Sequence, residues 1–170
     1  MKAYIRLKIN NINITYEKLG KQIWGVPGKN PWFNHFGDGE SFRKELDIGL
    51  GILPTDFNEK WKDTHKGWGS VMINVKKMQD RPELLVITDF IEELPYNQKA
   101  FYNMTYYVAT HVGGMITDRN RQEWITPDEF KKLHQSIMEE GFNQLLYKSI
   151  VIGKKETPGA EEPDVDDVIW

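Results

Sequence analysis

An imidazole and two carboxylates lie within six residues of each other on a glycine-rich segment, His35-Phe36-Gly37-Asp38-Gly39-Glu40. Side chains of these types can bind a divalent metal or exchange protons as general acid and base. The same composition also makes an ordinary surface turn, and we favour that interpretation. We therefore expect no catalytic residue, no metal and no cofactor here, and we treat His35, Asp38 and Glu40 as candidate binding residues.

The other motifs that could do chemistry are incomplete. The chain has no cysteine, which excludes disulfides, thiolate metal sites and cysteine nucleophiles. Residues 25–30 lack the glycine spacing and the Ser/Thr of a phosphate-binding loop, and residues 118–121 match a calcium loop only at Asp118. The chain has four histidines, His35, His65, His111 and His134. No two of them have the spacing of zinc ligands on one helix.

Residues 25–40 form an aromatic loop that contains Trp32, Phe33, His35 and Phe36. A loop this rich in rings either folds back on the core or meets a partner. We favour the core, because compact loops of this size are packed by their own side chains. Trp32 and Phe33 are the further candidate binding residues if the loop instead faces a partner.

Hydrophobic periodicity predicts mixed strands and helices along the body of the chain. Residues 2–9 alternate apolar and polar side chains, as in a half-buried strand. Short helices are expected from Thr15 and over residues 56–64, and a central strand over residues 84–90. Residues 41–53 and 70–78 fit a helix or a strand. With hairpins and no regular βαβ repeat, this pattern predicts one α+β domain over residues 1–155, a mostly antiparallel sheet with helices packed on one face.

The segment from Asn97 to Gln135 has the clearest element boundaries. We expect a helix capped by Asn97 and ended by Gly113-Gly114, then a hairpin that turns at residues 118–121. Thr126-Pro127-Asp128-Glu129 combines an N-cap threonine, a proline at the first helical position and a capping-box glutamate. The expected buried faces of the two helices are Phe101, Met104, Thr105, Val108 and Val112, and Phe130, Leu133, Ile137 and Met138.

Residues 156–170, ETPGAEEPDVDDVIW, form an acidic C-terminal tail with six Asp or Glu and no Lys or Arg. Since the whole chain carries a net charge of −3, residues 1–155 carry about +3. Acid followed by Val168, Ile169 and Trp170 suits a docking peptide, whose charges steer while its apolar end fills a pocket. The end resembles the C-terminal tips of bacterial and phage single-stranded-DNA-binding proteins. The same composition also fits a solvated terminus. We expect Val168, Ile169 and Trp170 to contact apolar surface, of their own domain or of a partner, while the acidic stretch before them stays solvated.

The N-terminal residues MKAYIRLKIN alternate polar and apolar side chains and lack the apolar stretch of a signal peptide. No apolar run approaches the length of a membrane span. We therefore expect a cytoplasmic protein that does not contact membranes.

Residues 106–118, YYVATHVGGMITD, followed by 124–130, WITPDEF, resemble a pattern in small bacterial immunity proteins of polymorphic toxin systems. In that family a helix ends in Gly-Gly, a hairpin holds an Asp, and a helix starting with Ser/Thr-Pro-x-Glu follows. The resemblance implies a non-catalytic protein that blocks a toxin by occupying its active face. It transfers no functional residue.

Three classes of function remain open. We favour an inhibitor or immunity-type protein that binds a protein partner, because its aromatic residues and patchy acidity suit a cationic, nuclease-like toxin. A single-stranded nucleic-acid binder with an acidic docking tail would stack bases on its aromatic rings, although the body is only modestly basic. The third class is a small hydrolase that uses His35, Asp38 and Glu40. The sequence leaves the oligomeric state open.

Overall fold

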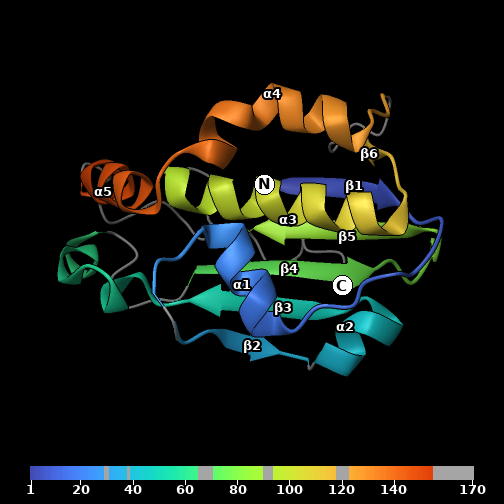
Figure 1. The fold of residues 1–170 in the computed structure, drawn as a ribbon, viewed down its shortest axis with the longest axis horizontal. Coiled ribbons are helices and arrows are strands. Elements are labelled where there is room, and N and C mark those ends of the chain that lie inside the picture. The colour runs from blue at the N-terminus through green and yellow to red at the C-terminus, as the bar shows by residue number, and fades with distance from the viewer. Residues whose placement is uncertain (29–30, 38, 65–70, 90–93, 118–122, 155–170) are drawn as a thin grey trace.

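The computed structural model describes residues 1–28, 31–37, 39–64, 71–89, 94–117 and 123–154, with residues 39–41 described by their backbone alone. These residues form a six-stranded sheet in the order β2-β3-β4-β5-β1-β6, and every pair of neighbours is antiparallel (Figure 1). The predicted α+β fold is confirmed. The strands are β1 (Lys2–Arg6), β2 (Asn34–Phe36), β3 (Ile48–Ile52), β4 (Val71–Lys77), β5 (Leu84–Asp89) and β6 (Ile116–Thr117).

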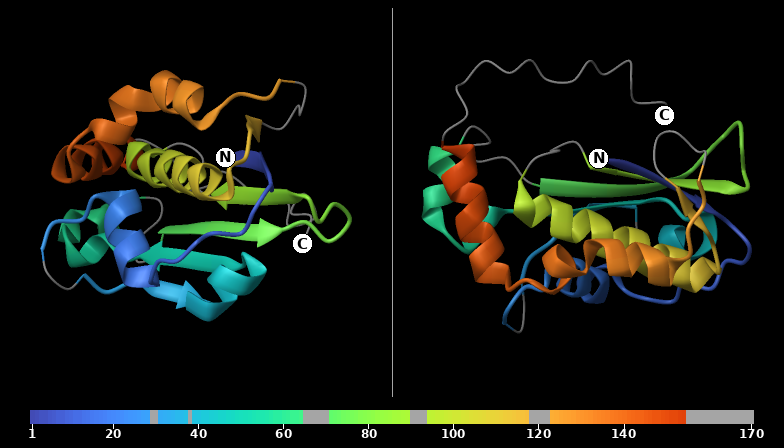
Figure 2. Two further views of the ribbon diagram at one scale, coloured as in Figure 1. Left: turned by 45° about the vertical axis from the view of Figure 1, so that its right-hand side comes forward. Right: turned by 90° about the horizontal axis from the view of Figure 1, so that it is seen from above.

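Helices cover one face of the sheet, as predicted. The long helix α3 lies along the strands, with α1 beside it and α4 packed on its outer side (Figure 2). The last helix, α5, stands at one end of the sheet (Figure 1). None of the helices in the described ranges is long and apolar enough to cross a membrane. The helices are α1 (Tyr16–Trp24), α2 (Gly39–Glu45), α3 (Pro95–Val112), α4 (Pro127–Glu139) and α5 (Phe142–Gly153), and the short 3-10 helices are η1 (Pro54–Asp56) and η2 (Glu59–Asp63).

The main core lies between the sheet and α3. Each strand turns alternate residues to the helices, and in the three middle strands these include Leu50, Ile73 and Ile87, all fully buried. Burying each such side chain stabilises the fold by about 1.5–3 kcal/mol. The predicted inward stripe of α3 is confirmed: Phe101, Met104, Thr105, Val108 and Val112 are all buried.

The N-terminal strand is shorter than predicted. It leaves the sheet after Arg6, because the backbone N–H groups of Lys8 and Ile9 donate to the carbonyl oxygen of Val112, at the last turn of α3. Ile9 is 56% exposed, so the prediction that the alternation continues to Ile9 is wrong. At Lys8 and Ile9 the backbone therefore bonds to the free carbonyl group at the end of α3 instead of pairing with a neighbouring strand.

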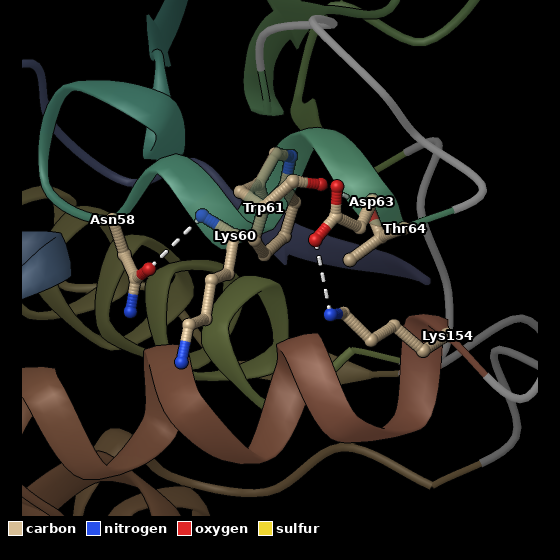
Figure 3. A network of polar contacts seen from close by, with 6 residues as sticks. All are labelled: Asn58, Lys60, Trp61, Asp63, Thr64 and Lys154. Carbon is tan, nitrogen blue, oxygen red and sulfur yellow. Dashed lines mark hydrogen bonds and ion pairs between the residues drawn. The ribbon is translucent and has the colours of Figure 1, made fainter.

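The predicted helix over residues 56–64 is also wrong, since η1 and η2 replace it. Asn58 separates them: it has an extended backbone, and its side-chain oxygen accepts a hydrogen bond from the N–H of Lys60 at 3.1 Å (Figure 3). Residues 41–53 contain both of the alternatives left open, because α2 precedes β3. Residues 71–77 form strand β4.

An aromatic cluster holds α5 at the end of the sheet. Phe142 of α5 packs edge-on against Tyr96 and Phe57, with ring centres 5.5 and 5.0 Å away. Trp61 of η2 is fully buried beside Tyr96 at 6.0 Å. Rings in these arrangements add stabilisation beyond their burial. Gly141 separates α4 from α5 and is the N-cap of α5.

Helix α3 begins earlier than predicted. Its N-cap is Leu94 and its first residue is Pro95, whereas Asn97 lies inside the first turn and is fully buried. Proline is favoured at the first helical position because it has no N–H to satisfy. The assignment of Asn97 as the cap is therefore wrong, and Pro95 carries the signal for the helix start.

The glycine pair at the end of α3 serves two purposes. Gly113 adopts the predicted left-handed conformation with φ 62°, and its N–H donates to the carbonyl oxygen of Ala109. A Cβ at Gly114 would overlap the carbonyl oxygen of Arg6 in β1. Ile116 and Ile125 then exchange two backbone hydrogen bonds of 2.9 Å, as the predicted hairpin requires. Its turn, residues 118–121, lies outside the described residues.

The start of α4 is confirmed in detail. The Thr126 hydroxyl accepts a hydrogen bond from the N–H of Glu129, and the Glu129 carboxylate accepts one from the N–H of Thr126. The buried face is only partly as predicted. Phe130 and Met138 are buried, but Leu133 is 70% exposed. His134 takes the place expected for Leu133, because its ring stacks on Tyr102 of α3 with ring centres 3.9 Å apart.

We predict that Thr126→Ala lowers the free energy of unfolding by about 1 kcal/mol, because the hydroxyl that accepts a hydrogen bond from the N–H of Glu129 is lost. Chemical denaturation measures the change. Thr110→Ala is the matched control: its exposed hydroxyl bonds the carbonyl oxygen of Tyr106 within α3, and its loss changes stability by less than about 0.5 kcal/mol. Equal losses in the two variants would contradict this account of the α4 start.

Burial against Tyr102 and Phe130 lowers the pKa of His134 from its ordinary value of 6.5. The folded chain therefore prefers the neutral imidazole, and the unfolded chain binds the proton more readily. We predict that this stability is complete above the ordinary pKa and is lost as the pH falls from that value through the lower pKa of the folded chain. Denaturation between about pH 7.5 and 5 should show a shallower decline for His134→Gln than for the natural chain. Parallel declines would refute the prediction.

Candidate functional site

The candidate site begins with Phe33, which ties the aromatic loop to α1. Its ring is only 4% exposed and lies against Gly20, where an added Cβ would come within 2.7 Å of the ring. Trp24 stacks alongside at 6.0 Å between ring centres. The expectation that this loop folds back on the core is therefore met by Phe33. Being buried, this candidate binding residue serves to position its neighbours.

The neighbours of Phe33 face outward. Trp32 is 63% exposed and Phe36 is 48% exposed, so the core interpretation does not extend to them. His35 is exposed as well, but its ring stacks on Tyr16 of α1 with centres 3.9 Å apart. The Nδ1 atom of His35 lies 2.8 Å from the carbonyl oxygen of Gly37. A carbonyl only accepts, so Nδ1 donates its proton in this contact.

Trp32, Phe33 and His35 line one shallow hollow of about 240 Å³ at the edge of the sheet. Pockets that enclose small molecules are generally larger, about 300–1,000 Å³. A hollow of this size matches one or two side chains of a partner. Its other lining residues are Tyr16, Glu17, Pro31 and Asn34.

The hollow carries one fixed negative charge. A hydrogen bond from its own backbone N–H, followed by one from the Tyr16 hydroxyl, lowers the pKa of Glu17, and His35 acts in the same direction. The same hydrogen bond raises the pKa of Tyr16. Glu17 is therefore ionised and Tyr16 neutral at physiological pH. The site presents a carboxylate next to two aromatic rings.

Tyr16 and Glu17 are the site residues that the sequence did not predict. The spacing of apolar residues assigns Tyr16 to the inward face of α1, and only the fold reveals that its ring meets His35. The predicted residues Asp38, the side chain of Glu40 and Trp170 lie outside the described residues. Within the described ranges, no three His, Asp or Glu side chains gather where they could hold a metal ion.

Strand β2 also presents a ring to the opposite side of the sheet. His35 and Phe36 are adjacent, so they point to opposite faces. Phe36 pairs with Gly49 of β3, and its ring lies over that glycine, where any Cβ would overlap it. The side of the sheet turned away from α1, α3 and α4 is called the open face below. No described helix lies on it (Figure 2).

We predict that Gly49→Ala destabilises the chain, although alanine in a strand is ordinarily better than glycine by about 0.5–1 kcal/mol. The new methyl group must push Phe36 off the sheet. In a Phe36→Ala background the same change should be neutral or stabilising, which gives a coupling free energy of about 1 kcal/mol or more. Additive effects in the double-mutant cycle would show that Phe36 does not rest on Gly49.

Comparisons with known proteins found no relative for this chain. No family model matches it, and neither a curated protein nor a solved structure matches it. The resemblance of residues 106–130 to immunity proteins therefore depends on those residues alone.

Proposed function

We propose that this chain is a non-catalytic binding protein of the immunity or inhibitor type, which acts in the cytoplasm by covering the active face of a cognate protein toxin. The observation that carries the proposal is a pair of exposed rings, Trp32 just before the anchored edge strand β2 and Phe36 at its end. The resemblance of residues 106–130 to immunity proteins agrees with it.

The aromatic edge, defined here as Tyr16, Trp32, His35 and Phe36, is held before any partner arrives. Phe33 fixes the loop to α1, the Tyr16 ring supports His35, and Phe36 lies on Gly49. Exposed Trp and Tyr residues are those that most often dominate the free energy of protein binding. Because Tyr16, His35 and Phe36 already rest on neighbouring groups, little of their side-chain entropy is lost when a partner covers them.

The backbone of β2 adds a second mode of recognition. Among the described residues, β2 pairs only with β3 and forms an edge of the sheet. Its outer N–H and C=O groups can pair with an extended segment of a partner, while the neighbouring hollow takes a side chain. This combination supports a protein as the partner rather than a small molecule.

Charge favours a cationic partner. Glu17 supplies an ionised carboxylate in the hollow. Enzymes that cleave nucleic acids present basic surfaces to the phosphate backbone. Complementary charge speeds association and excludes wrong partners more than it raises affinity. A nuclease-like toxin therefore fits this surface best.

We predict that Trp32→Ala weakens binding to the toxin by about 30-fold or more, the effect of removing one dominant interface residue. The probe is the protein encoded by the gene adjacent to this one, and titration calorimetry measures the affinity. Leu133→Ala on α4 is the matched control, since it also removes a large exposed apolar side chain but from a different surface. It should leave the affinity about unchanged.

A growth assay completes the test. Expression of the adjacent gene alone should arrest bacterial growth, and co-expression of this chain should restore it, less well with Trp32→Ala. An adjacent product that is harmless, or rescue that both variants support equally, would contradict the proposal. Turnover of nucleotides, esters or nucleic acid by the purified chain, lost when His35, Asp38 and Glu40 are replaced together, would assign it to the hydrolases instead.

A further inference from the structure

The open face of the sheet is cationic. On β1, β4 and β5, the residues that point away from the helices include three charged side chains, Lys2, Arg6 and Lys76, and all three are basic. The remaining outward residues of these strands are uncharged, and they are Tyr4, Met72, Asn74, Leu84, Val86 and Thr88.

A hollow of about 130 Å³ opens on this face where β4 turns toward β5. Tyr4, Met78 and Val86 belong to a small apolar cluster that forms its floor and that Trp124 extends. Its charged lining consists of three lysines, Lys2, Lys76 and Lys77, against one acid, Asp80. The hollow can therefore take an apolar side chain from a segment that is otherwise acidic.

Aromatic rings hold two of the cations over this surface. The Lys2 Nζ atom lies 5.8 Å from the centre of the Tyr4 ring, and the Arg6 guanidinium lies 4.3 Å from that of Trp124. Such contacts orient a cation without neutralising it. Lys2 and Arg6 thus keep a positive charge that an acidic ligand can use.

Residues 156–170 have the complementary composition. They hold six acids, no base, and the apolar residues Val165, Val168, Ile169 and Trp170. Acids interleaved with apolar residues match a basic surface with an apolar hollow. A tethered segment also has a high effective concentration at any surface it can reach.

The point of attachment allows this reach. The aromatic cluster fixes α5 at the end of the sheet, and the Nζ atom of Lys154 donates to an Asp63 carboxylate oxygen of η2 at 3.1 Å (Figure 3). In Figure 2, α5 runs from the helical layer toward the level of the strands. Residues 155–170 can extend about 50 Å at roughly 3.3 Å per residue, whereas the seven residues of β4 cover about 23 Å.

We propose that residues 156–170 dock on the open face of their own chain, with their acids against Lys2 and Arg6 of that face and against Lys77, which lines the hollow at the end of β4, and with an apolar side chain in the hollow. This docking is independent of the proposed function, because the aromatic hollow that contains Trp32 lies at the edge of the sheet beside α1. The bound segment shields the cationic face from other anionic ligands.

A spin label on the tail tests the proposal in the full-length chain. The chain has no cysteine, so Val165→Cys provides one labelling site. At low salt, we expect the label to broaden the amide signals of β1 and of residues 76–80 beyond detection and to leave those of α4 sharp. The end of β4, whose residues line this hollow, lies at the opposite end of the sheet from α5 (Figure 1), so attachment alone does not bring the label there. High salt should restore the signals.

Two charge-reversal variants give a matched comparison. Lys2→Glu with Lys77→Glu should abolish the broadening, whereas Lys131→Glu with Lys132→Glu on α4 should retain it. The pairs change the net charge equally, and Lys131 lies over Tyr106 at 5.6 Å much as Lys2 lies over Tyr4. Dispersed amide spectra confirm that each variant is folded. Broadening that is absent, spread evenly, or lost equally in both pairs would overturn the proposal.

Two further arms identify other occupants of the face. In the first, isotope-labelled chain that carries no spin label is mixed with spin-labelled chain that carries no isotope. Broadening of the isotope-labelled signals would mean that the tail binds a second copy. A single-stranded oligonucleotide is also titrated into the labelled chain. Should it shift the open-face amides while the spin label leaves them sharp, the face is a nucleic-acid surface. Either result would overturn docking within one chain.

Discussion

The fold depends on the burial of α3 against one face of the sheet. Residues on nearly every side of this helix are buried, because it contacts β1, β4 and β5 as well as α1, α4 and α5. Lys99 is buried with them, and burial lowers its pKa; its ammonium group donates to the carbonyl oxygen of Glu140 at 2.6 Å, where α4 ends. A cation near the C-terminal end of a helix also compensates its dipole. Helix α3 therefore positions α1, which in turn supports the aromatic edge.

Short sequence motifs correctly predicted those parts of the fold that depend on hydrogen bonds between residues close in sequence. The capping box at Thr126 and the left-handed Gly113 satisfy backbone groups within a few residues, so their sequence patterns are reliable guides. Patterns that depend on tertiary contacts were less informative. Apolar spacing placed Leu133 inside, but the stacking of His134 on Tyr102 turns Leu133 outward. The end of α3 draws the chain off the sheet after Arg6, which no alternation of residues reveals.

The candidate site shows the same division. Sequence composition identified Trp32, Phe33 and His35 as candidate binding residues, but it could not predict that Phe33 is buried while its neighbours are exposed. That separation depends on Gly20, whose missing side chain leaves room for the Phe33 ring. Tyr16 and Glu17 join the site because β2 pairs with β3 and so comes to lie beside α1. One-sided helical packing also leaves the open face with its basic residues, which a list of charges along the chain does not reveal.

Amide hydrogen exchange of the chain, free and bound to the product of the adjacent gene, tests most directly whether the aromatic edge is the binding surface. The account predicts slower exchange in the complex for residues 32–37 and for the first turn of α1, with α4 unchanged. Slower exchange confined to α4 and α5, or no difference between the free and mixed samples, would contradict it.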